Sequence, residues 1–345
     1  MSGRAVRRTA FGLATLVGGL LGAPMLLPET TSADRLPRRA LARPGSRFLT
    51  VDGVEVHHEI TGPNGGRTQG TDDDAPTLLL SHHFYGSTPV WDRFAPLLAD
   101  RHRIVTWDRP GFGLTERPVR GSLEHNPYTR TAAARLGWSL LDAIGADEVV
   151  LVGASAGGSN VLEMYAQAPE RVRALVLLAP AITGDVGAPP QVRRLLRTAP
   201  LRRLGPRVVE RFIGDITRER STRAWHDPSR ARDEDLAPYR DLTRVEGWSR
   251  GLWEVMTAEP PPDLRPVLRS IAVPTLVVTG AQDRTIAPRW GRWVAATVPG
   301  GRFTLLPDCG HVPHQERPDE LAAIVRPFLA EVLHADRDAL DRRDG

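Results

Sequence analysis

The stretch Val149-Val-Leu-Val-Gly-Ala-Ser-Ala-Gly-Gly158 decides the fold, because an apolar run leads directly into a serine flanked by small residues. Ser155 is the centre of a G-x-S-x-G pattern, which marks a sharp turn between a strand and a helix. Its neighbours two positions away must be small, since larger side chains would collide with the strand or the helix. Such a turn lifts the serine hydroxyl above a sheet, and the helix N-terminus favours a developing oxyanion. Ser155 is therefore predicted as a nucleophile, with a turn that has no chemistry as the alternative.

Short apolar runs alternate with helical patterns on both sides of this turn. Runs rich in Val, Leu and Ile are typical of strands buried on both faces of a parallel sheet, and their alternation with helices indicates a doubly wound α/β fold. A hairpin is predicted around Asp52-Gly53. The expected strands are 77–81, 103–107, 148–152, 172–178, 273–280 and 302–306, and the expected helices are 90–99, 128–144, 155–167, 288–298 and 318–333.

The α/β alternation breaks between residues 183 and 270. This stretch is rich in Arg, Pro and Trp and has no convincing strand, so it is predicted as an inserted helical cap. The α/β core is then residues 47–182 and 271–334, and residues 335–345 form a charged tail. Trp225, Trp248, Trp253 and Met256 either line an apolar pocket or bury the insert against the core. The arginine-rich run 193–211 is either a solvated helix face or a surface for anionic lipid headgroups.

The N-terminal segment resembles an export signal or a membrane anchor. Arg4, Arg7 and Arg8 precede an apolar run over residues 9–27, which is close to the length that spans a bilayer but is interrupted by glycines. Residues 1–33 are predicted as signal peptide or anchor, and residues 34–46 as a linker. The positive-inside rule then places the body outside the cytoplasm. A cytoplasmic protein with an N-terminal helix is the alternative.

Composition excludes several classes of protein. The 345 residues are 41% hydrophobic and 25% charged, as expected of a globular protein. Cys309 is the single cysteine, so neither an intrachain disulfide nor a CxxC metal site can form. The chain has no lysine, which excludes Schiff-base chemistry. The net charge is +4, but the first 50 residues carry eight Arg against Glu29 and Asp34, so the rest of the chain carries about −2. A nearly neutral body gives little support for nucleic-acid binding.

Two further residues follow predicted strands and complete a nucleophilic site. His311 lies just past the last strand, and Asp283 lies just past the strand before it. Ligand sites of open parallel sheets gather at the carboxyl edge, where both residues would meet Ser155. The imidazole would activate the serine, and the carboxylate would hold the imidazole in its correct tautomer. His314 is the nearest rival base, and we expect a surface or capping role for it.

Five blocks in this order resemble enzymes of the α/β-hydrolase fold with an inserted cap. They are His82-His-Phe-Tyr-Gly-Ser87, Asp108-Arg-Pro-Gly-Phe-Gly-Leu-Thr-Glu-Arg-Pro118, Gly153–Gly158, Gly280-Ala-Gln-Asp283 and Gly310-His311 with Glu316-Arg-Pro318. The resemblance implies a mostly parallel eight-stranded sheet, with Ser155 as nucleophile, His311 as base and Asp283 as its partner. It also implies an oxyanion hole from the backbone amides of Phe84 and Ala156.

One departure concerns the oxyanion loop. The family usually has His-Gly where this chain has His82-His83, so His83 either tolerates the local backbone or reshapes the loop. The imidazole of His83 would then point into the pocket, pack under the loop or face solvent.

The resemblance implies a serine hydrolase that cleaves a small or medium, apolar, ester-like substrate without a metal or organic cofactor. Serine at position 155 argues against dehalogenases and epoxide hydrolases of this fold, which use aspartate. Ala156 departs from the Gly-x-Ser-Trp signature of proline-type peptidases. C–C bond hydrolysis, cofactor-free peroxide chemistry and ligand binding with little turnover remain as alternatives. The sequence leaves the oligomeric state open.

Overall fold

In the computed structural model of the protein, which describes residues 35–63, 76–119, 125–182, 189–259 and 261–341, eight strands form one sheet. The strands are β1 Ser46–Val51, β2 Val54–Thr61, β3 Thr77–Ser81, β4 Ile104–Trp107, β5 Val149–Ala154, β6 Val172–Leu178, β7 Thr275–Gly280 and β8 Arg302–Leu306. Their order across the sheet is β1-β2-β4-β3-β5-β6-β7-β8. The β1/β2 and β2/β4 pairs are antiparallel and all others are parallel, which confirms the predicted sheet.

Helices cover both faces of the sheet because the central strands are apolar on both sides. Leu78 and Leu80 of β3 face a cluster that includes residues of α11, whereas Leu79 faces the opposite cluster, which includes residues of α2 and α3. The helix bounds are α2 Arg130–Ala143, α3 Ala156–Gln167, α8 Arg265–Ser270, α9 Pro288–Thr297, α10 Pro313–Glu316 and α11 Pro318–Asp341. Short 3₁₀ helices are η2 Arg38–Leu41, η4 Thr88–Trp91, η5 Ala95–Leu97, η6 Pro169–Arg171 and η7 Pro228–Arg230.

The predicted helix over residues 90–99 is wrong. Two 3₁₀ turns, η4 and η5, occupy this stretch instead. Pro96 lies in the first turn of η5, and in a continuous helix it would lack the amide hydrogen and clash with the carbonyl of Asp92. The closing helix is longer than predicted, since α11 continues through Asp341 into the expected tail.

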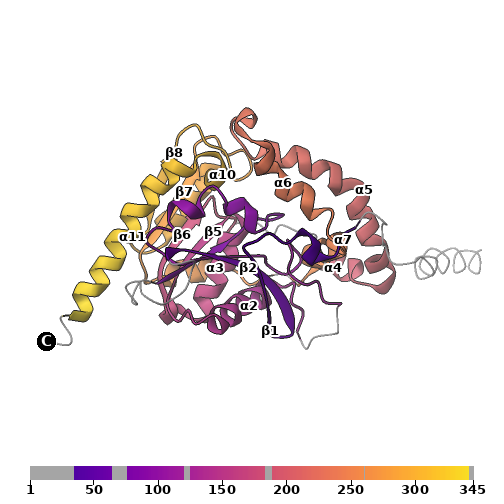
Figure 1. Cartoon of the computed structure of the whole chain (residues 1–345), viewed down its shortest axis with the longest axis horizontal. Coiled ribbons are helices and arrows are strands. Elements are labelled where there is room, and N and C mark those ends of the chain that lie inside the picture. Colours follow the sequence, from indigo (N-terminus) through magenta and orange to yellow (C-terminus); the bar gives the residue numbers. More distant parts are fainter. Residues whose placement is uncertain (1–34, 64–75, 120–124, 183–188, 260, 342–345) are drawn as a thin grey trace, which may run out of the picture.

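Four helices lie between β6 and α8, in the stretch that lacked strand patterns. They are α4 Pro190–Leu196, α5 Ala199–Arg223, α6 Asp233–Leu242 and α7 Trp248–Thr257, and they lie together in Figure 1. Trp225, Trp248 and Trp253 are buried, whereas Met256 is exposed. Trp248 and Trp253 belong to the same apolar cluster as the central strands, so these side chains bury the inserted helices against the core.

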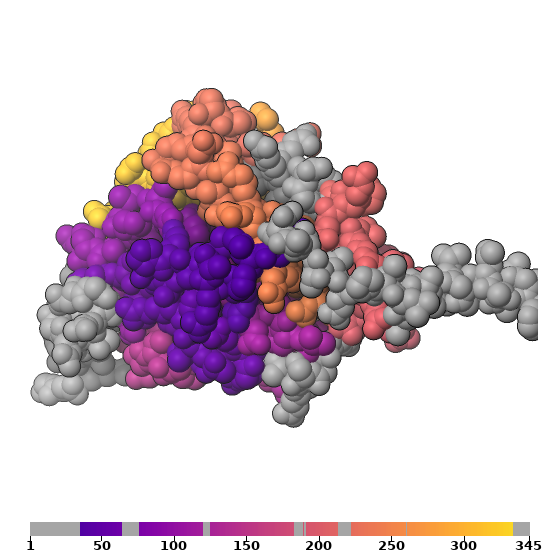
Figure 2. Space-filling model, turned by 45° about the vertical axis from the view of Figure 1, so that its right-hand side comes forward, coloured from indigo at the N-terminus to yellow at the C-terminus, as the bar shows by residue number. Residues whose placement is uncertain are grey.

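The segment before β1 lies against the body. Leu36 forms a bridge with Val245 of the inserted region, and Arg43 pairs with Glu59 and Asp92. Figure 2 shows this indigo part of the chain beside the orange inserted helices. The predicted signal or anchor, residues 1–33, lies outside the described residues. Among the described residues, no helix has the length and apolar character needed to cross a bilayer.

Candidate active site

Ser155 lies on a strained turn between β5 and α3. Its backbone has φ 51° and ψ −114°, a left-handed region that non-glycine residues rarely occupy. The turn is fixed by a bond from the Ser155 amide to the Leu178 carbonyl (2.8 Å), and the Ser155 carbonyl accepts from the amides of Gly158 and Ala181. Strain that the surroundings hold in this way is typical of functional sites.

The small residues around Ser155 are required by close backbone approaches. A Cβ on Gly153 would lie 2.6 Å from the carbonyl oxygen of Gly157, and a Cβ on Gly157 would lie 2.0 Å from the carbonyl oxygen of Ser81. The second contact brings α3 against the end of β3, so the glycine spacing reflects the packing of the helix on the strands.

Replacing Gly157 by alanine should therefore force α3 away from β3. Because the added methyl group meets rigid backbone, we expect a loss of about 3 kcal/mol or more in the free energy of unfolding. Urea denaturation measures this loss. Gly45→Ala is the matched control, since its Cβ would meet only the Glu59 side chain at 4.0 Å. Equal stability of the two variants would contradict the packing explanation.

Asp283 and His311 form a hydrogen-bonded pair at the carboxyl edge of the sheet. His311 Nδ1 lies 2.8 Å from Asp283 Oδ2, and both residues are buried. The other carboxylate oxygen of Asp283 accepts from the amides of Thr285 (2.8 Å) and Ile286 (2.9 Å). The carboxylate can only accept, so Nδ1 carries the proton and Nε2 is left as the basic nitrogen.

Two side chains hold the loops that carry this pair. The side-chain oxygen of Gln282 accepts from the backbone amide of Cys309 (3.1 Å), and the backbone amide of Gln282 donates to the Cys309 carbonyl (2.9 Å). These two bonds join the loops after β7 and β8. Glu316 accepts from the amides of Gly310 (2.7 Å) and His226 (3.0 Å). The His311 amide also donates to the Ala224 carbonyl at 2.6 Å. The histidine loop is therefore fixed to the inserted region as well as to the core.

Ser155 shares the sheet edge with this pair but is not bonded to it. The hydrogen bonds among the described residues include none between the Ser155 hydroxyl and His311. Catalytic hydrogen bonds are often long before substrate binds. The roles of Ser155, His311 and Asp283 as one catalytic unit therefore stay a prediction.

The two predicted oxyanion donors lie on different elements, Phe84 in the loop after β3 and Ala156 at the start of α3. Phe84 is 44% exposed, and no hydrogen bond among the described residues uses its amide. Ala156 is the first residue of α3, where an amide has no partner within the helix. His83, the departure from the family pattern, is buried, and its Nδ1 lies 3.0 Å from the Phe84 carbonyl oxygen.

The inserted helices reach this loop through one tyrosine. Tyr239 of α6 lies with its hydroxyl 3.0 Å from His83 Nε2 and 2.8 Å from Gln315 Oε1, and its ring stacks on that of His83. His83 therefore packs under the inserted region. The expectation of a surface or capping role for His314 is wrong, because His314 is fully buried and its ring lies 4.5 Å from that of Trp91.

Three buried histidines should make the protein sensitive to mild acid. Burial lowers the pKa of His83 to about 4 and holds the pKa of His82 and of His314 well below the usual range. The unfolded chain therefore binds more protons below pH 6.5, and stability present above that pH is lost as the pH falls toward 4. Each group contributes a slope of up to about 1.4 kcal/mol per pH unit.

Urea denaturation at pH 7, 6 and 5 should show this decline in the free energy of unfolding. His314→Phe keeps an aromatic ring against Trp91 and removes one titrating group, so its decline should be shallower. An unchanged slope in His314→Phe, or a flat profile in the wild type, would contradict the prediction.

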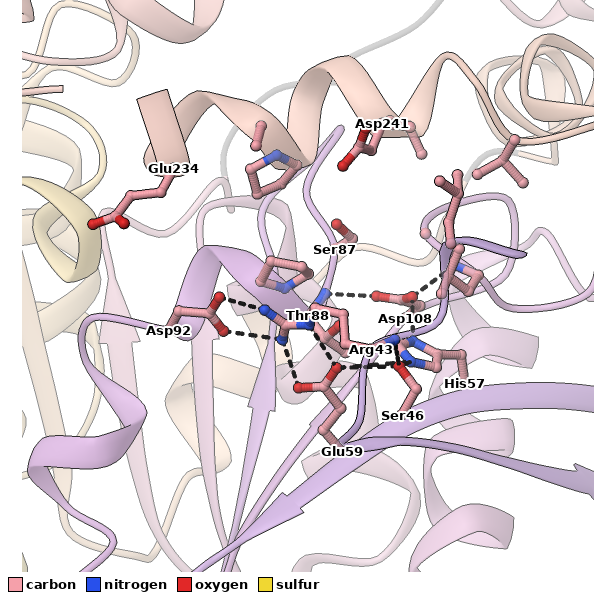
Figure 3. Close-up of a pocket in the computed structure, with 18 residues that line it drawn as sticks. Arg43, Ser46, His57, Glu59, Ser87, Thr88, Asp92, Asp108, Glu234 and Asp241 are labelled. Atoms are coloured by element: carbon pink, nitrogen blue, oxygen red, sulfur yellow. Dashed lines mark hydrogen bonds and ion pairs between the residues drawn. The ribbon is translucent and has the colours of Figure 1, made fainter. Parts of the chain in front are cut away.

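A cavity of about 270 Å³ lies away from the serine, between the N-terminal strands and α6 (Figure 3). His57 bonds Asp108 (2.6 Å) and Ser46 (2.8 Å) at its floor, beside the ion pairs of Arg43 with Glu59 and Asp92. Neither Ser155 nor the Asp283–His311 pair lines it. We therefore place the candidate active site at the serine edge.

Comparison with known proteins shows the family to which the chain belongs. Residues 76–318 match the family model of the alpha/beta hydrolase fold. The chain is 27% identical over 303 residues to a 2-hydroxy-6-oxononadienedioate/2-hydroxy-6-oxononatrienedioate hydrolase of Klebsiella pneumoniae, covering 83% of this chain and 96% of that one.

Two solved structures have the same fold. A thermophilic esterase from Thermogutta terrifontis gives a TM-score of 0.65 at 24% identity, covering 84% of this chain and 99% of the other. A bromoperoxidase from Bacillus anthracis gives 0.66 at 18% identity, covering 83% and 99%. The chain belongs to the α/β-hydrolase fold family, and it is an enzyme of the hydrolase class.

Several side chains at the site could not be predicted from the sequence. Glu316, Tyr239 and Gln315 make contacts over long sequence distances, and no local pattern reports such contacts. Glu316 alone had a signal, since it belongs to one of the blocks that resemble the family.

Proposed function

We propose that the protein hydrolyses a small or medium carboxylic ester through an acyl-enzyme on Ser155. The observation that carries this proposal is the Asp283–His311 pair, whose hydrogen bond makes Nε2 the basic nitrogen of the neutral imidazole, at the same sheet edge as the strained turn that carries Ser155. A serine hydroxyl needs such a base to become a nucleophile.

In the proposed reaction, His311 carries the proton in both acylation and deacylation. The Ser155 oxygen attacks the ester carbonyl while its proton passes to His311 Nε2, and the carbonyl oxygen becomes an oxyanion facing the amides of Phe84 and Ala156. The tetrahedral intermediate collapses, and the leaving alkoxide takes the proton from His311. Water then attacks the acyl carbonyl and gives a proton to His311 Nε2. The second tetrahedral intermediate collapses, His311 returns that proton to the Ser155 oxygen, and the carboxylic acid is released.

An apolar substrate fits the surroundings of the loop. The exposed ring of Phe84 stands beside Phe112, with 5.6 Å between the ring centroids. The Phe84 ring offers apolar surface next to the proposed oxyanion site, and the buried Phe112 ring packs against it. The nearly neutral body gives no strong field for a charged substrate.

Nitrophenyl esters of increasing acyl-chain length test the proposal. We expect saturable hydrolysis with a defined optimum of chain length and no requirement for added metal. Hydrolysis that stays at the rate of a matched Ser155→Ala sample for every ester would overturn it. A protein that binds apolar ligands without turnover would instead be a binding protein of this fold.

C–C bond hydrolysis is a second candidate. The Klebsiella relative is named for a substrate that holds a ketone and two carboxylates rather than an ester. The cleavage of a 2-hydroxy-6-oxo-dienoate, measured as the loss of its ultraviolet absorbance, distinguishes C–C bond hydrolysis from ester hydrolysis. A kcat/KM well above that for every ester would favour the second.

We also propose that residues 1–33 direct export or anchor the protein, with the hydrolase outside the cytoplasm. The support is the arginine cluster before the apolar run. N-terminal sequencing of the protein from fractionated cells tests it, and an intact Met1 in the soluble cytoplasmic fraction would overturn it.

A further inference from the structure

We propose that Arg109 is a positioning residue that orients and polarises the peptide between His83 and Phe84, and so strengthens the Phe84 amide as an oxyanion donor. The inference rests on the proposed function, because it concerns the same oxyanion site. It assigns a role to a buried cation that the reaction steps leave unused.

The carbonyl of His83 and the amide of Phe84 belong to one peptide group. In a trans peptide these two groups point to opposite sides, and the described residues contain no cis peptide bond. Whatever holds the His83 carbonyl therefore sets the direction of the Phe84 amide. Three donors converge on that oxygen: His82 Nδ1 at 2.7 Å, the Gly86 amide at 3.1 Å and Arg109 Nη2 at 3.2 Å.

Arg109 holds this arrangement at two further points. Its Nη2 also donates to the carbonyl of His82 at 2.8 Å, so one guanidinium nitrogen bridges two consecutive carbonyls. Its backbone amide donates to His82 Nε2 at 3.1 Å. Because Nε2 accepts, the proton of neutral His82 is on Nδ1, which then donates to the His83 carbonyl. The backbone of residue 109 thus fixes the tautomer of a second donor to the same oxygen, and substitutions of the Arg109 side chain leave that bond in place.

No carboxylate within the described residues neutralises the charge of Arg109, whose guanidinium carbon lies 5.3 Å from the centroid of the Phe112 ring. The ion pairs of the described residues do not include Arg109, although it is only 9% exposed. The carboxylate of the neighbouring Asp108 forms hydrogen bonds with the His57 ring (2.6 Å) and with the backbone amides of Thr88 and Leu114. Burial lowers the pKa of Arg109 to about 9, which leaves the guanidinium cationic at neutral pH.

A buried cation without a counterion is expensive to keep in a fold. Here its field acts on the carbonyls of the oxyanion loop. A carbonyl that accepts strong hydrogen bonds makes the amide of the same peptide a stronger donor, since neighbouring hydrogen bonds polarise one another. The hydrogen bond from the Phe84 amide would then stabilise the oxyanion of the intermediate more than it stabilises the neutral carbonyl oxygen of the bound ester.

Two substitutions separate the charge from the hydrogen bond. Arg109→Gln keeps a donor but removes the charge, and Arg109→Lys keeps the charge. Arg117→Gln is the matched control, because Arg117 is also buried and donates to the carbonyls of Thr115 and Gly113 in the same segment, away from the His83 carbonyl.

We expect kcat for a nitrophenyl ester to fall about tenfold to a hundredfold in Arg109→Gln with little change in KM, and less in Arg109→Lys. A trifluoromethyl ketone, which forms an oxyanion adduct with a serine, should lose affinity by the same factor. The methyl ketone of the same chain length should bind equally to wild type and variant. Arg117→Gln should leave the ratio of the two ketone affinities unchanged.

Equal losses for both ketones, or the same affinity ratio in Arg109→Gln as in Arg117→Gln, would overturn the inference and leave the proposed function intact. If Arg109→Gln does not fold, Arg109→Lys decides: the trifluoromethyl ketone should lose more affinity than the methyl ketone in this variant, and equal losses for both ketones or a wild-type ratio would overturn the inference. A wild type that neither hydrolyses esters nor binds the trifluoromethyl ketone would remove the proposed function, and this inference with it.

Discussion

Replacing Ser155 by alanine should lower kcat for ester hydrolysis by about 10⁵-fold while the fold persists, because the only proposed nucleophile is lost. Alanine is smaller than serine and fits the position. The turn should persist, because no hydrogen bond of the Ser155 side chain holds it among the described residues. Initial rates with a nitrophenyl ester, measured beside the thermal unfolding midpoint, check both parts.

Ser139→Ala is the matched control for this experiment. Ser139 lies on α2, and its hydroxyl donates at 2.6 Å to Asp52, which is not a residue of the proposed site. Its variant should keep wild-type turnover. A Ser155→Ala enzyme that retains more than a few per cent of the rate would show that another group attacks the substrate.

Replacing Asp283 by asparagine should lower kcat by about 10⁴-fold. The amides of Thr285 and Ile286 donate to Oδ1 and would hold the asparagine oxygen there. The amide nitrogen would then face His311 Nδ1, which must accept, so the proton moves to Nε2. An imidazole protonated at Nε2 cannot take the serine proton.

Asp308→Asn tests whether this loss is specific. Asp308 is exposed near the histidine loop and has φ 49°, a conformation that asparagine tolerates. Activity should stay near that of the wild type in this variant. Near-normal turnover in Asp283→Asn would mean that a different carboxylate orients the base.

Much of the fold could be predicted because its signals are local. The glycines beside Ser155 reflect a contact within a few ångströms of the turn, and the apolar runs report burial on both faces of the sheet. The absence of the predicted helix over residues 90–99 also has a local cause, since Pro96 has no amide hydrogen and disrupts a continuous helix.

The rest depended on contacts between distant parts of the chain. His314 is buried because Trp91 of η4 packs against it, more than 200 residues away in sequence. The doubt about His83 is resolved by Tyr239 and by the donors around its carbonyl, none of which a motif contains. The tertiary structure decides whether a polar side chain is buried and which partner it contacts. The spacing of residues in the sequence predicts only the helix, strand or loop on which the residue lies.

A fluorophosphonate probe followed by mass spectrometry tests the central claim most directly. The probe bonds to a serine that an adjacent base activates, so the wild type should gain the mass of one adduct, and peptide mapping should place it on Ser155. No adduct on wild-type protein, or an adduct on another residue that persists in Ser155→Ala, would contradict the claim that Ser155 is the nucleophile.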